Sequence, residues 1–191
     1  EHMGLLANSG HFPARTANME MLSEVYGITN FRFDIDATKL ATNPNVPHAD
    51  NAIWMHPWSP EALALQGRGV KVWDPRVIRA NANLIDGFLT SVREKLNPGG
   101  HVFIGVNRGS SSSTNLRSAA VSNGNLARWG VSEIAQRLGF ELLTQSEVFY
   151  IRSSDYPSGD YPGYTPRHSE GMPLKDVAQE MIVLRYPGVI S

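Results

Sequence analysis

Apolar and polar residues alternate along this chain with two periods, one typical of strands and one typical of helices. A period of two, or a short unbroken apolar run, marks five candidate strands. These are Phe31–Ile35, Ala52–Met55, Val102–Val106, Phe140–Leu143 and Met181–Leu184. Segments rich in Asn, Pro or Gly lie between several of them and are expected to form connections.

Apolar positions spaced three and four residues apart predict three helices. The first covers Ala14–Tyr26. The second begins after Asp74, an N-cap residue followed by proline, and its apolar stripe continues to Leu96, just before the turn Asn97–Gly100. The third runs from Leu126 to Leu138 and is ended by a glycine.

Strands that alternate with helices predict an α/β fold in which helices flank a mostly parallel sheet. The last two strands enclose Ser153–Gly171, a polar segment rich in Tyr, Pro and Gly. Their hairpin-like order predicts one antiparallel strand near the C-terminus. The chain length suits one domain, which we assign to residues 4–191, with Glu1–Met3 interpreted as a cloning scar.

Charge and composition limit the possible functions. Lys and Arg number 17 against 18 Asp and Glu, so a net charge of −1 provides no general attraction for RNA, and any RNA contact has to be local. The absence of cysteine excludes disulfides, thiolate zinc sites and a cysteine nucleophile. No apolar run approaches the roughly 20 residues of a membrane span, and no signal peptide is evident. We therefore expect a soluble protein without membrane contact, cytoplasmic or of unknown compartment.

Other chemistry has little support in the sequence. Gly109–Thr114 is a low-complexity segment that we interpret as an exposed loop, with phosphate contact as the alternative. His48, His101 and His168 have no spacing suited to a metal ion, so we expect no metal site. No order of Ser, His and Asp typical of hydrolases stands out.

Four motifs follow one another along the chain. Phe12–Leu22 begins with an aromatic-Pro-Ala pattern ahead of Asn and Leu, and Phe33–Leu40 reads Phe-Asp-Ile-Asp-Ala-Thr-Lys-Leu. Leu96–Val102 contains Leu-Asn-Pro-Gly-Gly, and Tyr161–Gly171 contains Tyr-Pro-Gly-Tyr followed by Arg and Gly. In this order they resemble the ribosomal-RNA uridine N3-methyltransferases, a family of class I, Rossmann-like methyltransferases. The second and fourth motifs are the most specific.

The resemblance implies a doubly wound sheet, S-adenosylmethionine as methyl donor and a pyrimidine in ribosomal RNA as acceptor. By residue match, Asp36 and Ala37 would hold the adenine of the donor, and Met55 would join them in cofactor binding. The alternative is that Asp36 caps the turn that follows it, a common role for Asp at a strand end.

The tetrapeptide from Met55 to Trp58 stands where the family has Asn-Phe-Pro-His after a central strand. Ligands bind at the carboxyl ends of strands in open α/β sheets, so His56, Pro57 and Trp58 are the candidate catalytic residues. Trp58 would stack on a base, and His56 would contact the edge of that base. The alternative is a packed tryptophan beside a surface histidine.

Tyr161, Tyr164 and Arg167 form an aromatic and basic group that is suited to unpaired RNA. We interpret them as substrate-binding residues. An ordered loop that covers the edge of the sheet is the alternative.

Met3–Gly10 contains no G-x-G and follows no strand, so the N-terminal strands of the family are missing or atypical in this sequence. If the domain is incomplete at its N-terminus, the chain is expected to derive from an enzyme. If the donor site has been lost, the chain is expected to be a non-catalytic Rossmann-like binding module, and the fold alone does not decide between the two. Missing central strands would also expose an apolar edge, which predicts self-association or a protein partner that completes the sheet.

Overall fold

The computed structural model describes residue 24 and residues 35–55, 57–110, 124–144, 147–152 and 176–188. The chain forms two compact units. The first comprises Glu1–Asp36 and Ser153–Leu174, and the second comprises Ala37–Arg152 and Lys175–Ser191. The assignment of residues 4–191 to one domain stays a prediction.

Only three residues of the first unit are described. Glu24 is helical, in agreement with the predicted helix Ala14–Tyr26, whose other residues lie outside the described ranges. Ile35 and Asp36 belong to no helix or strand, and the rest of the predicted strand Phe31–Ile35 is likewise outside the described ranges. The fold described below is therefore that of the second unit.

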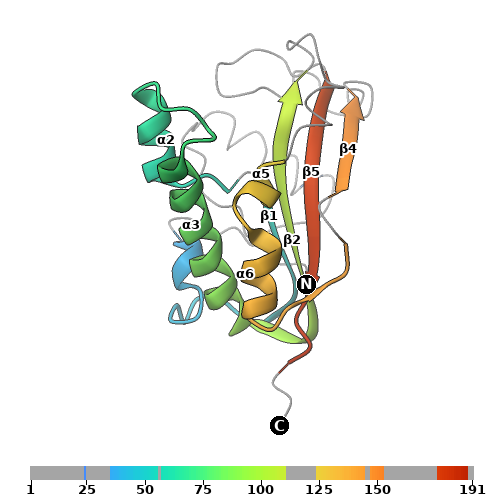
Figure 1. Cartoon of the computed structure of the whole chain (residues 1–191). Coiled ribbons are helices and arrows are strands. Elements are labelled where there is room, and N and C mark those ends of the chain that lie inside the picture. Colours follow the sequence, from blue (N-terminus) through green and yellow to red (C-terminus); the bar gives the residue numbers. More distant parts are fainter. Residues whose placement is uncertain are drawn as a thin grey trace. The chain divides into compact units, whose positions relative to one another are not determined.

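Five strands, four helices and one 3₁₀ turn are described in the second unit (Figure 1). The strands are β1 (Ala49–Met55), β2 (Leu96–Ser110), β3 (Glu141–Leu142), β4 (Glu147–Arg152) and β5 (Asp176–Arg185). The helices are α2 (Pro60–Gly67), α3 (Pro75–Arg93), α5 (Asn125–Arg128) and α6 (Val131–Arg137), and the 3₁₀ turn is η1 (Ala37–Lys39).

The direction of β5 sets it apart from the other described strands. β1 and β2 pair in parallel, whereas β2 and β5 pair in antiparallel. On its other edge β5 pairs in antiparallel with β3 and then with β4. Among the described strands β5 alone runs against the rest, which confirms the predicted antiparallel strand near the C-terminus of a mostly parallel sheet.

The two faces of the sheet differ in burial. Trp54 of β1 contacts Phe88 of α3, and Ile104, its partner on β2, is fully buried together with Ile182 on β5. Figure 1 shows α3, α5 and α6 on one side of the sheet. On the other face Ile53 of β1 remains 65% exposed, and β1 pairs with β2 alone among the described strands. Self-association through this edge stays a prediction.

Helix α3 forms where the sequence predicts it. The Asp74 carboxylate accepts the backbone N–H of Arg76 at 2.9 Å, and proline occupies the first helical turn. The buried stripe then includes Val77, Ile85, Phe88, Leu89 and Val92. Its Phe88 ring lies 4.4 Å from the Trp54 ring, centroid to centroid, and so packs α3 against β1.

The start of β2 differs from the prediction. α3 ends at Arg93, and Leu96, predicted to be helical, begins β2. Asn97–Gly100, predicted as a turn, forms a bulge in this strand, because β2 advances five residues while β1 advances two between successive pairs. Gly99 adopts a φ of 84°, its N–H donates to the Tyr186 carbonyl, and the Gly100 carbonyl accepts the Tyr186 N–H. The residues predicted to form a turn thus make backbone hydrogen bonds with Tyr186, which lies just beyond the end of β5.

Three further predictions need correction. The third helix is divided into α5 and α6 at Gly130, which adopts a left-handed φ of 65°. The strand predicted at Phe140–Leu143 is shorter, and β4 was not predicted. Of the loop predicted at Gly109–Thr114, the first two residues belong to β2 and the others are outside the described ranges.

Every helix in the described ranges is too short or too polar to cross a membrane.

Leu89 and Leu63 offer a matched test of this core. Leu89 of α3 is fully buried, so Leu89→Ala is expected to lower the free energy of unfolding by about 2–5 kcal/mol. Leu63 of α2 is 53% exposed, and Leu63→Ala is expected to change it by less than about 0.5 kcal/mol. Urea unfolding followed by tryptophan fluorescence measures both variants. Equal losses would contradict the burial described.

Asp74 makes helix α3 sensitive to acid. Its side-chain hydrogen bond with Arg76, and then the Arg76 backbone N–H, lower the pKa of Asp74 from 3.8 to about 2. A lowered folded-state pKa stabilises the fold above about pH 4, and this stabilisation is lost as the pH falls toward 2. We expect Asp74→Asn, which keeps an N-cap side chain, to lower the urea midpoint at pH 7. The difference from the unmodified chain should shrink between pH 4 and pH 2, and a difference independent of pH would oppose this assignment.

Candidate functional site

The loop after β1 lies at the carboxyl end of the parallel pair β1 and β2. β1 ends at Met55, and Pro57, Trp58 and Ser59 then lead into α2. The ends of parallel strands and the loops that follow them form the ligand side of open α/β sheets. Met55, Pro57 and Trp58, three of the residues predicted to form a site, are therefore together on that side.

Met55 lies across the neighbouring strand. Its register partner on β2 is Gly105, and a methyl group added to Gly105 would lie 2.6 Å from both Sδ and Cε of Met55. Only a residue without a side chain leaves room for the thioether in this position. Met55 remains 37% exposed, so part of it faces solvent beside the end of the sheet.

A buried carboxamide ties the loop to helix α3. The Oδ1 atom of Asn81 accepts the backbone N–H of Ser59 at 2.8 Å, and Asn81 is completely buried. The Nδ2 atom of Asn81 has no hydrogen-bond partner among the described residues. Ser59 in turn caps α2, because its Oγ accepts the N–H of Ala62 at 3.4 Å. The loop is thus held at both helices, and Pro57 beside it is buried.

Trp58 is partly packed and partly accessible. Its ring meets the ring of Trp129 edge to face, with centroids 5.1 Å apart and planes at 83°. Trp129 is 2% exposed, whereas Trp58 is half-buried. Both alternatives for Trp58 therefore keep support, since one part of the indole packs on the core and another part is open to a ligand.

A buried carboxyl group lies beside the start of α5. Glu180 of β5 is fully buried and is the register partner of Val106 on β2. Its carboxylate lies directly against Gly124, where an added methyl group would collide with it. Gly124 therefore has to be glycine for the carboxylate to occupy this position.

Asp36 and Ala37 are placed at the start of η1. Asp36 is exposed and Ala37 is half-buried as the first residue of the turn. Thr38 packs on α3, since a methyl group added to Gly87 would lie 3.1 Å from its Cγ2 atom. The N–H of Ala41 donates to Ser91 Oγ at 2.8 Å and ties the end of the turn to the same helix. Asp36 stands immediately before a turn, which fits both a capping role and a cofactor role.

The remaining predicted site residues are not described. His56, Tyr161, Tyr164 and Arg167 lie outside the described residues, so their roles stay predictions. Among the residues that are described, no three His, Asp or Glu side chains gather as they would around a metal ion.

Sequence reasoning missed Asn81 and Glu180, although both left a signal. Asn81 occupies the i+4 position between Val77 and Ile85 on the apolar stripe of α3. Glu180 lies on the same inward face of β5 as Ile182 and Leu184, because the three residues are spaced two apart. A polar residue at a position that the period assigns to the core indicates a buried, hydrogen-bonded group.

Comparison with protein families decides the class of this fold. Residues 8–168 match the model of the BMT5-like family, described as rRNA (uridine-N3-)-methyltransferase BTM5-like. The chain belongs to this family. The match includes the motif at Phe33–Leu40 and the Tyr-Pro-Gly-Tyr motif that begins at Tyr161, and it confirms the resemblance seen in the sequence. No curated protein matches this BMT5-like chain with significance.

A solved structure with a TM-score above 0.5 supports the Rossmann-like methyltransferase fold. NSun6 from Pyrococcus horikoshii, solved with SFG, has a TM-score of 0.51 at 18% identity over 97% of this chain and 41% of its own. A fibrillarin pre-rRNA processing protein from Methanococcus jannaschii has a TM-score of 0.45 at 13% identity, covering 97% and 56%. A precorrin-6y C5,15-methyltransferase from Geobacter metallireducens GS-15 has a TM-score of 0.47 at 9% identity, covering 96% and 67%. The BMT5-like chain spans about half the length of the first two.

Asn81 and Ser59 allow the loop anchor to be tested. Asn81→Ala leaves the Ser59 N–H buried without its acceptor, and we expect it to lower the free energy of unfolding by about 1–3 kcal/mol. Ser59→Ala keeps that backbone bond and removes only a long cap bond, so a loss of about 0.5 kcal/mol is expected. Denaturant unfolding of both variants measures the difference. A larger loss for Ser59→Ala would show that the cap, and not the carboxamide, holds the loop.

Proposed function

We propose that this chain takes part in S-adenosylmethionine-dependent methyl transfer to ring nitrogen N3 of a uridine in RNA. The observation that carries the proposal is membership of the BMT5-like family over residues 8–168. The position of the Met55–Ser59 loop at the carboxyl ends of β1 and β2 supports it, because ligands of such sheets bind there.

In this proposal Asp36 and Ala37 receive the adenine of the cofactor. The Asp36 carboxylate accepts the adenine amino group, and the Ala37 N–H meets a ring nitrogen. The described residues fit these tasks, since Asp36 is exposed and Ala37 carries a small side chain at the start of η1. Met55, exposed beside Gly105, offers an apolar contact to the same ligand.

The cofactor, when bound, supplies a methyl group on a positively charged sulfur. Asp36, Ala37 and Met55 would hold the cofactor, which would supply its methyl group to N3 of the uridine by displacement at the methyl carbon, with the sulfur as leaving group and the N3 proton released. This displacement requires the three atoms in line, so holding the base contributes more to the rate than acid or base catalysis. In the proposal His56 contacts the edge of the base and takes up the N3 proton, while Pro57 shapes the loop.

Trp58 stacks on the uridine in this proposal. Its edge-to-face contact with Trp129 holds the indole in one orientation, and its accessible part is left for the base. Tyr161, Tyr164 and Arg167 bind neighbouring unpaired nucleotides through stacking and charge. The Asn81 anchor keeps the loop in place while the base enters.

A non-catalytic binding module is the second candidate function. Met55 stands where the family has Asn, so one side chain of the site differs from the family pattern. In this case the same surface would bind a ligand without transferring a methyl group.

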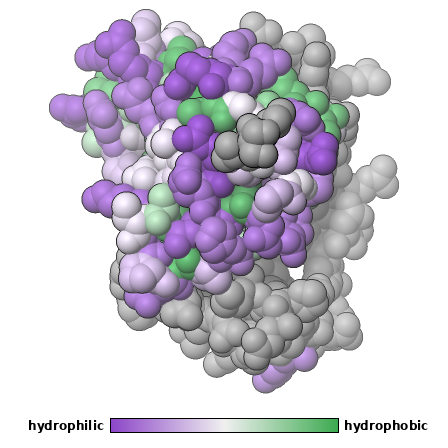
Figure 2. All heavy atoms as spheres, turned by 90° about the horizontal axis from the view of Figure 1, so that it is seen from below, coloured by the Kyte–Doolittle hydropathy of each residue, from purple (hydrophilic) through white to green (hydrophobic). Residues whose placement is uncertain are grey.

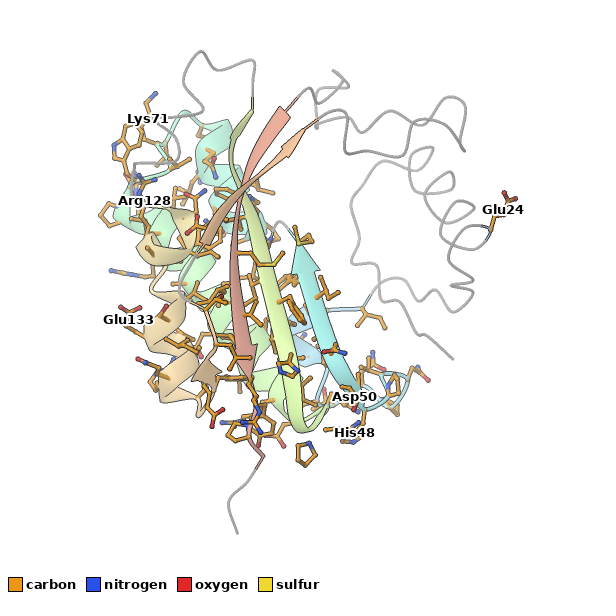
Figure 3. All side chains as sticks on the ribbon, turned by 90° about the vertical axis from the view of Figure 1, so that its right-hand side faces the viewer. Glu24, His48, Asp50, Lys71, Arg128 and Glu133 are labelled. Atoms are coloured by element: carbon orange, nitrogen blue, oxygen red, sulfur yellow. The ribbon has the colours of Figure 1, made fainter. Side chains whose placement is uncertain are left out.

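Cofactor binding separates the two candidates. We expect isothermal titration of the chain with S-adenosylmethionine, and with its demethylated product, to detect binding that Asp36→Ala weakens at least about 10-fold, the loss expected from one charged hydrogen bond. Asp50→Ala is the matched control. Asp50 is exposed at the opposite end of β1, where its carboxylate accepts Asn97 Nδ2 at 2.8 Å (Figure 3).

No binding at millimolar ligand would reject cofactor binding by this chain, and would leave either an enzyme whose donor site needs residues outside this sequence or the binding module. Equal losses in the Asp36 and Asp50 variants would reject Asp36 as the adenine ligand.

A further inference from the structure

The turn between α2 and α3 is held by a well-defined helix end. Gly69 has a φ of 83°, its N–H donates to the Gln66 carbonyl at 2.8 Å, and the N–H of Val70 donates to the Leu65 carbonyl at 3.1 Å. This is the Schellman pattern, which ends a helix and directs the next residue back toward the core. Val70 accordingly packs on a buried cluster that includes Ala62 and Val77.

Trp73 is displayed at the tip of the following turn. The N–H of Asp74 donates to the carbonyl of Lys71 at 3.0 Å and closes the turn Lys71–Asp74. Trp73 is the third residue of this turn and remains 63% exposed. Tryptophan is a highly buried residue on average, so an indole held open by an ordered turn indicates a binding surface.

Basic side chains surround this tryptophan in the sequence. Four basic residues and one acidic residue occur between positions 68 and 79, although the whole chain has a net charge of −1. Arg68, Lys71, Arg76 and Arg79 are all exposed. The acidic residue, Asp74, is already occupied by a two-pronged contact with Arg76 at 2.9 and 3.0 Å. The local charge is therefore positive in a chain that offers no general attraction to polyanions.

This turn lies on the ligand side of the second unit. Figure 3 places Lys71 and Arg128 at the end toward which β1 and β2 run, and His48 and Asp50 at the opposite end. The view from that opposite end is mostly hydrophilic over the described residues, with only scattered apolar positions (Figure 2). α2 has eight residues, so its length of about 12 Å separates the turn from the loop at Trp58.

We propose that Arg68, Lys71, Trp73 and Arg76, here called the α2–α3 surface, bind unpaired RNA next to the nucleotide held at Trp58. One base stacks on the Trp73 indole, and the cations contact the phosphates on either side of it. One aromatic ring among cations matches a base flanked by phosphates better than it matches an apolar protein groove. The choice of RNA over DNA rests on the function proposed above. The arguments from stacking on Trp73 and from the positive charge do not depend on that function.

Fluorescence anisotropy with a labelled 12-nucleotide oligouridine tests the surface. Trp73→Ala is expected to weaken binding about 10-fold, within the range for loss of one stacked base, and to leave the salt dependence unchanged. Trp73→Phe should retain most of the affinity, because it keeps an aromatic face. Lys71→Gln should lower the slope of log K against log salt by about 0.7, the value for one phosphate contact on a single strand.

Arg137→Gln is the matched control. Arg137 is an exposed cation on α6 that pairs with Asp86 at 2.7 Å, outside the α2–α3 surface, and its loss should leave RNA binding nearly unchanged. The proposal fails if the unmodified chain binds no oligouridine, or if the Trp73 and Lys71 variants bind as tightly as the control. The latter result would place any bound oligouridine outside the α2–α3 surface. Binding that depends on Trp73 in a chain that binds no S-adenosylmethionine would retain the surface and reject the cofactor site proposed at Asp36.

Discussion

The packing of α3 against one face of the sheet is the interaction on which the rest of the second unit depends. Ile85 and Leu89 of the helix, and Ile104, Ile182 and Leu184 of the sheet, are all fully buried. Burying side chains of this size contributes about 1.5–3 kcal/mol each, which makes this layer the main source of stability among the described elements. The Trp54–Phe88 contact extends the layer to β1 at the edge. β1 is thus held both by its pairing with β2 and by a helix that follows it in the chain.

This packing also determines where the loop after β1 can be held. Asn81 lies one helical turn before Ile85 on the buried stripe, so the helix that covers the sheet also presents a carboxamide to Ser59. Ser59, Asn81 and Glu180 are three of the four buried polar residues described in the chain, and all three lie toward the carboxyl ends of the strands. Buried polar groups restrict the conformation of their surroundings when they are hydrogen-bonded. Most of the buried polar groups described therefore border the ligand side, whereas Ser91 anchors the end of η1.

Local patterns in the sequence were sufficient to predict much of this framework. β1, the core of β2, β5 and the start of α3 each depend on period, capping residue or an unbroken apolar run, all of which lie within a few neighbouring residues. The position of Met55, Pro57 and Trp58 at the end of a strand was predictable to the same extent, whereas their role in a site stays a prediction. What could not be predicted depends on distant partners. The Asn97–Gly100 bulge exists because Tyr186 supplies its hydrogen bonds, and Asn81 acts on a residue 22 positions away.

The position of β5 in the chain has a consequence for how the protein is made. β5 supplies hydrogen bonds to β2 on one edge and to β3 and β4 on the other, yet the ribosome completes it after all of them. Until β5 emerges, β2 has no partner on that edge and the two short strands have none on theirs. Contacts between residues as far apart as His101 and Arg185 have to close late, and contacts of such long sequence separation are generally slow to form. Pairing of β2 with β5 therefore has to follow pairing of β2 with β1 during synthesis.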